Sequence, residues 1–227
     1  MTSYLIVVAH PDDEVLGAGA TISKLAGEGH KVYVCILSGL AEARSNRPTT
    51  VELTNDMNSA TKTLGVAEVI TGNFPNIAFN TVPHIELVQF IEAAILKTKA
   101  DVVFTHHPND LNNDHYHTSI ACQAAVRLFQ RRLEITPIRE LLFMEISSAT
   151  DWALNSACRQ FSPNTFIEVE AGHLNEKIKA LSQYRNVMHQ LPHPRSAEGL
   201  RSLAICRGGQ AGVRYAEAFE SVFRRIV

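Results

Sequence analysis

A histidine and three carboxylates stand close together near the start of the chain, in the segment HPDDE at residues 10–14. The segment directly follows residues 5–9, an apolar, β-branched run typical of a buried strand. Ligands bind beyond the carboxyl ends of strands in open α/β sheets, and crowded carboxylates repel one another unless a cation neutralises them. We therefore expect His10 and Asp13 to bind one metal ion, which leaves Asp12 free to accept a proton from water. The alternative is that Asp12 or Asp13 only caps the next helix.

A second cluster of the same kind, HHPNDLNNDHYH at residues 106–117, follows another apolar run at residues 101–105. The ends of two parallel strands can face one another across a crevice, so one imidazole from this cluster would complete a site of two histidines and one aspartate. Such a site keeps one position open for catalysis. Spacing does not choose among the four histidines of the cluster, and at least two of them are expected to be partly buried residues with local hydrogen bonds instead. These four are His106, His107, His115 and His117.

The elements that must position these clusters follow from the alternation of two patterns in the first half of the chain. Strand-like runs alternate with segments whose apolar residues have helical spacing. The runs are 5–9, 31–37, 67–71 and 101–105, and the helical segments are about 14–28, 51–64 and 83–98. This order predicts an α/β fold with a Rossmann-like, mostly parallel sheet flanked by helices and the active site at the carboxyl ends of the strands.

The second half of the chain has a more mixed pattern. It predicts strands at 140–146 and 165–170 and helices at about 116–132, 172–189 and 213–225. Segments 38–50 and 190–212, rich in Gly, Pro, Ser or Arg, are expected to be mobile loops. Because no repeat or long linker interrupts the pattern, we expect a single domain over residues 1–227.

Composition excludes several classes of function. The 227 residues are 45% hydrophobic and carry a formal net charge of −2, which argues against binding to nucleic acid or to anionic membranes. No apolar stretch is long enough for stable membrane insertion, and the first residues lack the basic start of a signal peptide. Four widely spaced cysteines without a CxxC pair are expected to be reduced, as in a cytoplasmic protein. A small-molecule partner is expected; the oligomeric state is open, and a homo-oligomer is compatible with the sequence.

The segment GAGA at residues 17–20 could suggest a dinucleotide-binding loop. However, the GxGxxG pattern is incomplete, and HPDDE occupies the turn where the phosphate-binding glycines would lie. We therefore do not expect a dinucleotide site.

Taken in order, several blocks resemble the bacterial branch of the PIG-L/LmbE-like N-acetylglucosaminyl deacetylases. The blocks are AHPDDE (9–14), HHPNDLNNDH (106–115), SATDW (148–152), FSPNTF (161–166), HPRS (193–196) and RGGQAGVRYAEAF (207–219). The resemblance spans the chain and implies a zinc-dependent hydrolase that removes an N-acetyl group from an amino sugar or its conjugate. It implies that His10, Asp13 and His115 bind the metal and that Asp12 is the general base. Iron(II) or cobalt(II) could occupy similar ligands.

The chain departs from the family at Asn112, where many members have a histidine that helps to polarise the scissile carbonyl. An amide can donate a hydrogen bond to an oxyanion, but it cannot deliver a proton near neutral pH. Either Asn112 stabilises the oxyanion while protonated Asp12 serves the leaving amine, or another histidine takes over. His193, in the HPRS segment, is the candidate for that second role.

Two arginines in predicted loops, Arg44 and Arg195, are candidates for binding a hydroxyl, phosphate or carboxylate of the substrate, although solvated surface arginines are the alternative. Trp152, the only tryptophan, either stacks on a sugar ring or packs in the core. Arg207 and Glu217 are expected to form a structural ion pair. The alternative functions are hydrolysis of a different N-acyl group, such as formyl, and binding of a metal or sugar without catalysis.

Overall fold

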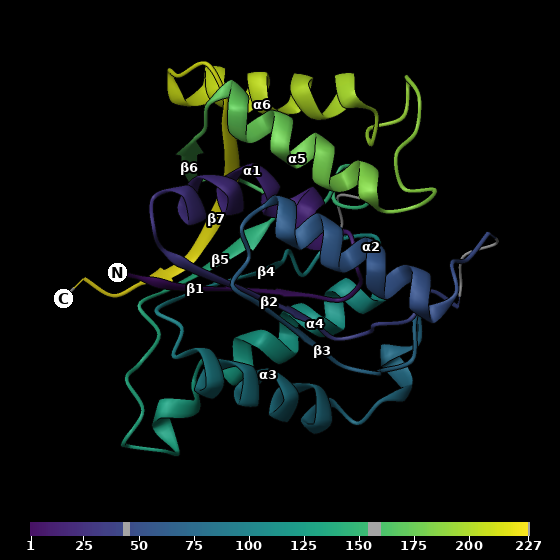
Figure 1. Cartoon of the computed structure of the whole chain (residues 1–227). Helices are drawn as coiled ribbons and strands as arrows, with labels where there is room; N and C mark the ends of the chain where they lie inside the picture. Colours follow the sequence, from purple (N-terminus) through teal and green to yellow (C-terminus); the bar gives the residue numbers. More distant parts are fainter. Residues whose placement is uncertain (43–45, 154–159, 227) are drawn as a thin grey trace.

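The computed structural model describes residues 1–42, 46–153 and 160–226, and it contains one seven-stranded sheet between two layers of helices (Figure 1). The order of the strands across the sheet is β3 (Glu68–Thr71), β2 (Lys31–Ile36), β1 (Ser3–Val8), β4 (Val102–His106), β5 (Glu140–Met144), β7 (Ala216–Arg224) and β6 (Thr165–Glu168). The first five strands are parallel, whereas β7 runs antiparallel to both β5 and β6. The prediction of a Rossmann-like, mostly parallel α/β sheet flanked by helices is thus confirmed.

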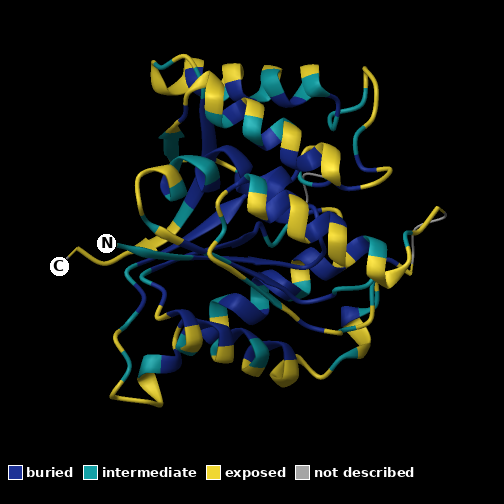
Figure 2. Ribbon diagram, in the orientation of Figure 1, coloured by how far each residue is buried: buried dark blue, intermediate teal, exposed yellow. Residues whose placement is uncertain are grey.

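Helices cover both faces of the sheet, which explains why the central strands are apolar throughout. One face carries α1 (Asp13–Gly27), α2 (Thr50–Thr63), α5 (Ala171–Gln183) and α6 (Ala197–Ala211), and the other carries α3 (His84–Thr98) and α4 (Asn113–Ala125) (Figure 1). Two short 3₁₀ turns, η1 (Phe79–Thr81) and η2 (Leu128–Gln130), complete the described elements. Alternate residues of β1 enter separate cores, Ile6 and Val8 on one face and Leu5 and Val7 on the other. Figure 2 shows the sheet buried and the outer sides of the helices exposed.

Helix α1 bends at Ala18, whose backbone (φ −144°, ψ 19°) is not helical. The glycines on either side let other side chains approach the helix closely. A Cβ atom at Gly17 would lie 2.8 Å from Cδ1 of Ile146, and one at Gly19 would lie 2.9 Å from Cγ of Lys177. The glycines of the GAGA segment therefore allow close packing of α1 against Ile146 and Lys177.

Two predictions for the C-terminal half were wrong. Residues 213–225 were expected to be helical, but most of this segment is strand β7, because pairing with β5 and β6 outweighs the helix preference of its Ala and Glu residues. Residues 190–212 were expected to be a loop, but they contain α6, which Ser196 caps by accepting the N–H of Gly199. Two helices also end before their predicted bounds: α4 at Ala125 and α5 at Gln183.

Cys35 and Cys122 are buried free thiols, and burial raises the pKa of Cys122 to about 12. Cys206 is also free but exposed, and Cys158 lies outside the described residues. Among the helices in the described ranges, none has both the length and the apolar character needed to cross a bilayer.

Candidate metal centre and active site

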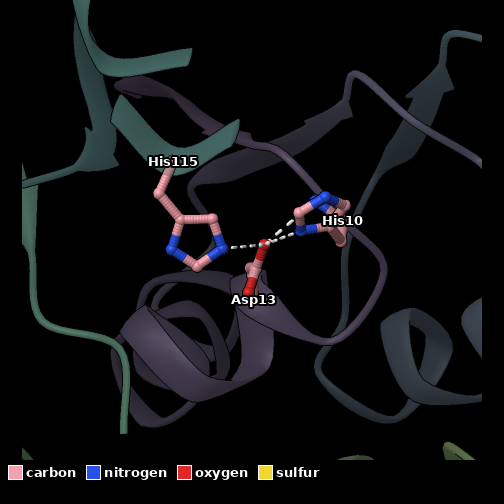
Figure 3. Close-up of side chains that lie close together, drawn as sticks. All are labelled: His10, Asp13 and His115. Carbon is pink, nitrogen blue, oxygen red and sulfur yellow. Dashed lines mark hydrogen bonds and ion pairs between the residues drawn. The ribbon is translucent and has the colours of Figure 1, made fainter. Parts of the chain in front are cut away.

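Three side chains from the two predicted clusters meet at the carboxyl ends of the neighbouring parallel strands β1 and β4 (Figure 3). His10 follows β1, Asp13 begins α1, and His115 lies in the first turn of α4. Oδ2 of Asp13 is 3.4 Å from Nδ1 of His10 and 3.2 Å from Nε2 of His115. One ligand atom from each residue lies within 4.8 Å of the others, and the exposed fractions of the three residues are only 2–7%. The sequence therefore folds so that two imidazoles and a carboxylate share one buried point.

The outer nitrogen of each of these histidines faces a second buried carboxylate. Nε2 of His10 is 2.9 Å from Oδ2 of Asp114, and Nδ1 of His115 is 3.1 Å from Oδ2 of Asp110. Such carboxylates hold a metal-binding imidazole in one orientation and tautomer, with the other nitrogen free for the metal. The donor set therefore fits a zinc ion, which favours nitrogen and oxygen ligands in tetrahedral sites.

The carboxylates also control the charge of the site. Burial by itself lowers the pKa of His10, but contacts with Asp114 and Asp13 raise the pKa above its usual value. Burial likewise lowers the pKa of His115, but Asp13 and Asp110 outweigh it and raise the pKa to about 10. Although burial opposes ionisation of Asp13, His115 and His10 hold its pKa well below the usual range. The cluster is thus built to hold positive charge beside Asp13, which is what a cation site requires.

The remaining histidines of the second cluster have other partners. Nε2 of His106 accepts the N–H of Ala9 at 2.9 Å, so its proton lies on Nδ1 and neither nitrogen offers a free lone pair. Burial, and then the stacked ring of His115 at 3.9 Å, lower the pKa of His106 to about 3. A second grouping of His106, Asp110 and His115 is therefore less suited to a metal. The ring of His107 makes edge contacts with the rings of Phe143 and Phe161, and its Nε2 lies 3.6 Å from Oε2 of Glu220. His117 lies on α4 against Tyr116.

Asp12 occupies the turn between β1 and α1 in a strained conformation, with φ at 106°. Although it is the N-terminal capping position of α1, its side chain makes no capping hydrogen bond, which weakens the alternative that it serves only the helix. Oδ2 of Asp12 is 3.6 Å from Nη1 of Arg195. Backbone strain of this kind persists where the surroundings enforce it, and it is frequent at functional sites.

A cavity of about 560 Å³ opens beside the cluster. It is lined by the two histidines and two aspartates already described together with residues of four segments: Asn76, Ile77, Leu111, Asn112, Asn113, Ser148, Ala149, Trp152 and Arg195. Asn112 caps α4, where its Oδ1 accepts the N–H of Asp114 at 2.9 Å, so only its amide N–H groups remain to donate. Nε of Arg195 donates to O of Ser147 and Oγ of Ser148, which fixes the guanidinium at the cavity wall.

The other predicted residues are placed differently. His193 is not among the described residues that line this cavity; its ring lies 5.4 Å from the ring of Trp152 and 4.2 Å from that of His189. Arg44 lies outside the described residues. Trp152 lines the cavity and is 45% exposed, so packing in the core is excluded.

The predicted ion pair between Arg207 and Glu217 is wrong, because each residue has another partner. Arg207 lies on α6 and binds Glu145 at 2.6 Å. Glu217 lies on β7 and binds Lys177 of α5 at 2.5 Å. The two residues belong to one sequence block at 207–219, but the fold places them on different elements with different neighbours.

Sequence reasoning missed two orienting carboxylates, Asp110 and Asp114, and several residues that line the cavity: Asn76, Ile77, Leu111, Asn113, Ser148 and Ala149. Asp110 and Asp114 stood between the histidines of the second cluster, and this interleaving was an available signal for their orienting role. Asn76 and Ile77 gave no such signal, because they follow β3 and are distant from both clusters in the chain.

Comparison with known proteins links the chain to a family and to a curated relative. The sequence model of the PIG-L family, described as GlcNAc-PI de-N-acetylase, matches residues 5–126. The chain is 27% identical over 190 residues to the uncharacterized deacetylase YaiS of Escherichia coli K12, which covers 80% of this chain and 90% of YaiS.

Two solved structures share the fold. The N,N′-diacetylchitobiose deacetylase of Pyrococcus horikoshii superposes with a TM-score of 0.76 at 20% identity, over 96% of this chain and 83% of that one. GalB of Pseudomonas putida KT2440, a 4-carboxy-2-hydroxymuconate hydratase, superposes with a TM-score of 0.78 at 20% identity, over 100% and 98%. Because the family model covers more than half of the sequence, including both segments of the candidate metal site, the chain belongs to the PIG-L family.

Proposed function

We propose that this protein is a zinc-dependent hydrolase that removes the N-acetyl group from an amino sugar or an amino-sugar conjugate. The observation that carries the proposal is the convergence of His10, Asp13 and His115 at a buried point beside Asp12, on the wall of a cavity. Membership of the PIG-L family and the similarity to YaiS support deacetylation as the reaction. The name of the chitobiose deacetylase supports an acetylated amino sugar as the substrate.

When bound by His10, Asp13 and His115, a zinc ion would supply Lewis acidity towards water and the amide carbonyl. Asp12 accepts the proton of the attacking water while the new C–O bond forms. An N–H of Asn112 donates to the carbonyl oxygen as negative charge develops there. The C–N bond then breaks, and the proton held by Asp12 passes to the leaving nitrogen, so that amide and water become acetate and a free amine.

The geometry favours Asp12 over His193 for the second proton transfer. Asp12 lines the cavity, whereas the ring of His193 lies against Trp152 and not among the described lining residues. Arg195, held by Ser147 and Ser148, remains a candidate for binding a substrate hydroxyl or anionic group.

Iron(II) or cobalt(II) in place of zinc, and an acyl group other than acetyl, are the variants of this proposal. The fold itself does not decide the chemistry, since GalB shares it and is a hydratase.

The test measures metal content and acetate release for a panel of N-acetylated amino sugars, with and without chelator. The Asp12→Asn variant should retain the metal and lose at least about 100-fold in kcat, because proton transfer by a positioned side chain contributes roughly 10²–10⁴-fold. Asparagine also tolerates the positive φ at this position. Asp101→Asn is the matched control, since Asp101 binds the N–H of Ser3 at the opposite edge of the sheet. Full activity of Asp12→Asn, or metal-free protein with undiminished turnover, would refute the proposal.

A further inference from the structure

Three large apolar side chains are exposed around the cavity that opens beside the cluster of His10, Asp13 and His115. Ile77 is 47% exposed, Leu111 62% and Trp152 45%, whereas the metal-binding residues are at most 7% exposed. We name Ile77, Leu111 and Trp152 the apolar rim. Apolar side chains gathered in the open around a concave site, with polar groups deeper inside, are typical of a ligand-binding surface.

Ile77 is held in place by the same carboxylate that orients a metal-binding histidine. Its φ of 59° lies in the left-handed region, which is a strained conformation for a β-branched residue. The N–H of Ile77 donates to Oδ2 of Asp114 at 2.7 Å, and that oxygen also lies 2.9 Å from Nε2 of His10. The side chain of Ile77 therefore has a fixed position relative to His10 and the other candidate metal ligands.

The other two rim residues are connected to each other and to the cluster. The N–H of Leu111 donates to O of Ala149, in the turn that carries Trp152. Oγ1 of Thr150, in the same turn, donates to Oδ2 of Asp110, the carboxylate that faces His115. Three segments that follow β3, β4 and β5 thus present apolar surface from one connected structure.

We propose that the substrate is an acetylated amino sugar with an apolar aglycone, and that this aglycone binds the apolar rim. The inference rests on the proposed function. The scissile carbonyl must reach the buried cluster, and an acetyl group has only one methyl group beyond that carbonyl. Asn76, Asn112 and Asn113 line the cavity and suit the hydroxyls of a sugar. The more exposed rim is then left for the group on the far side of the sugar, and a cavity of about 560 Å³ leaves room for it.

The test compares phenyl and methyl glycosides of N-acetylglucosamine. Turnover is measured with the zinc-loaded protein, and binding with the zinc-loaded Asp12→Asn variant. We expect the phenyl glycoside to exceed the methyl glycoside about tenfold or more in kcat/KM and in affinity. The methyl glycoside of N-hexanoylglucosamine separates an apolar aglycone from an apolar acyl chain, and it should bind no better than the N-acetyl compound.

Two rim variants test whether the rim causes this preference. Leu111→Asn removes an exposed apolar side chain, and Ile77→Asn does so with a residue that tolerates the positive φ. Each variant should reduce the ratio of kcat/KM for the phenyl glycoside to kcat/KM for the methyl glycoside. The reduction should be about fourfold for every buried methylene contact that is lost. Leu133→Asn is the matched control, because Leu133 is 93% exposed in the connection between η2 and β5, and the ratio should not change.

The outcomes separate the two proposals. Turnover of both glycosides with equal kcat/KM, or a preference for the hexanoyl compound alone, overturns the aglycone proposal and leaves deacetylation standing. A rim-dependent binding preference without any acetate release supports the apolar aglycone and refutes the proposed reaction. A preference that survives both rim variants overturns the assignment of the rim.

Discussion

Replacing Glu217 by glutamine tests how the protein stabilises the bend in α1, the helix that begins with Asp13. In a regular helix the N–H of Ala20 would bond to O of Leu16. Here, Nζ of Lys177 donates to O of Leu16 at 2.8 Å, and Oε1 of Glu217 accepts the N–H of Ala20 at 3.2 Å. Oε2 of Glu217 also accepts the N–H of Thr21 at 2.6 Å. Lys177 and Glu217 bind each other at 2.5 Å, so one ion pair satisfies three backbone groups at the bend.

The magnitude follows from burial. Lys177 is 5% exposed and Glu217 6%, so removing one charge leaves the other buried without its partner. Breaking a buried pair in this way costs about 3–5 kcal/mol. We expect about 3 kcal/mol for Glu217→Gln, because the amide oxygen still accepts one backbone N–H. For a domain of this size, that loss lowers Tm by about 6–12 °C.

The assay is thermal and urea denaturation of a double-mutant cycle. Lys177→Met together with Glu217→Gln should be more stable than the sum of the single effects predicts, with a coupling energy of about 1 kcal/mol or more. The control is the exposed pair of Lys179 and Glu176 on the same helix, at 3.2 Å. Glu176→Gln should change the free energy of unfolding by less than about 0.5 kcal/mol.

Two results would refute this reasoning. A change in Tm of less than about 2 °C for Glu217→Gln would mean that the pair does not stabilise the bend to the extent that its burial requires. Strict additivity of the two substitutions would mean that the residues act independently, despite the distance between them.

Three further predictions concern the candidate metal centre. Asp114→Asn removes the charge that faces Nε2 of His10, so affinity for zinc should fall about 10- to 100-fold in competition with a chelating dye; an unchanged affinity would show that Asp114 does not act through His10. His193→Gln should lower kcat less than tenfold, because the ring is not among the described lining residues of the cavity; a loss as large as that of Asp12→Asn would make His193 the proton donor. Zinc at 100 times its dissociation constant should stabilise the fold by about 2.7 kcal/mol, or about 5–11 °C in Tm, relative to chelated protein; equal Tm values would argue against a native metal.

The parallel part of the fold was predictable because its central strands are largely buried on both faces, while its edge strand β3 is partly buried. Such strands appear in the sequence as continuous apolar runs, and the runs at 5–9, 31–37, 67–71 and 101–105 correspond to β1, β2, β3 and β4 within one or two residues. Strand β7 was not predictable in the same way, although the edge strand β6 was expected at residues 165–170. Strand β7 contains buried Glu217 and Glu220, and their burial depends on partners supplied by other elements.

The part of the site that follows β1 and β4 directly in the chain was also predictable, whereas the part that depends on contacts between distant segments was not. Position after β1 and β4 was sufficient to predict that HPDDE and the second histidine cluster would meet, because neighbouring parallel strands end at the same edge. The choice of His115 among four histidines rested on resemblance. The structure supplies a physical reason against one of the other three, because Nε2 of His106 already accepts the N–H of Ala9.

The position of Asn76 and Ile77 at the cavity could not be predicted from the order of the strands. They follow β3, and β2 and β1 separate β3 from β4 in the sheet, so strand order alone does not bring them to the second cluster. Their position depends on Asp114, which accepts the N–H groups of Ile77 and Phe79 while it orients His10. The carboxylate of Asp114 thus orients His10, which would bind the metal, and positions Ile77, which would contact the substrate. A substitution at Asp114 should therefore change metal affinity and glycoside preference together, whereas Leu111→Asn should change only the preference.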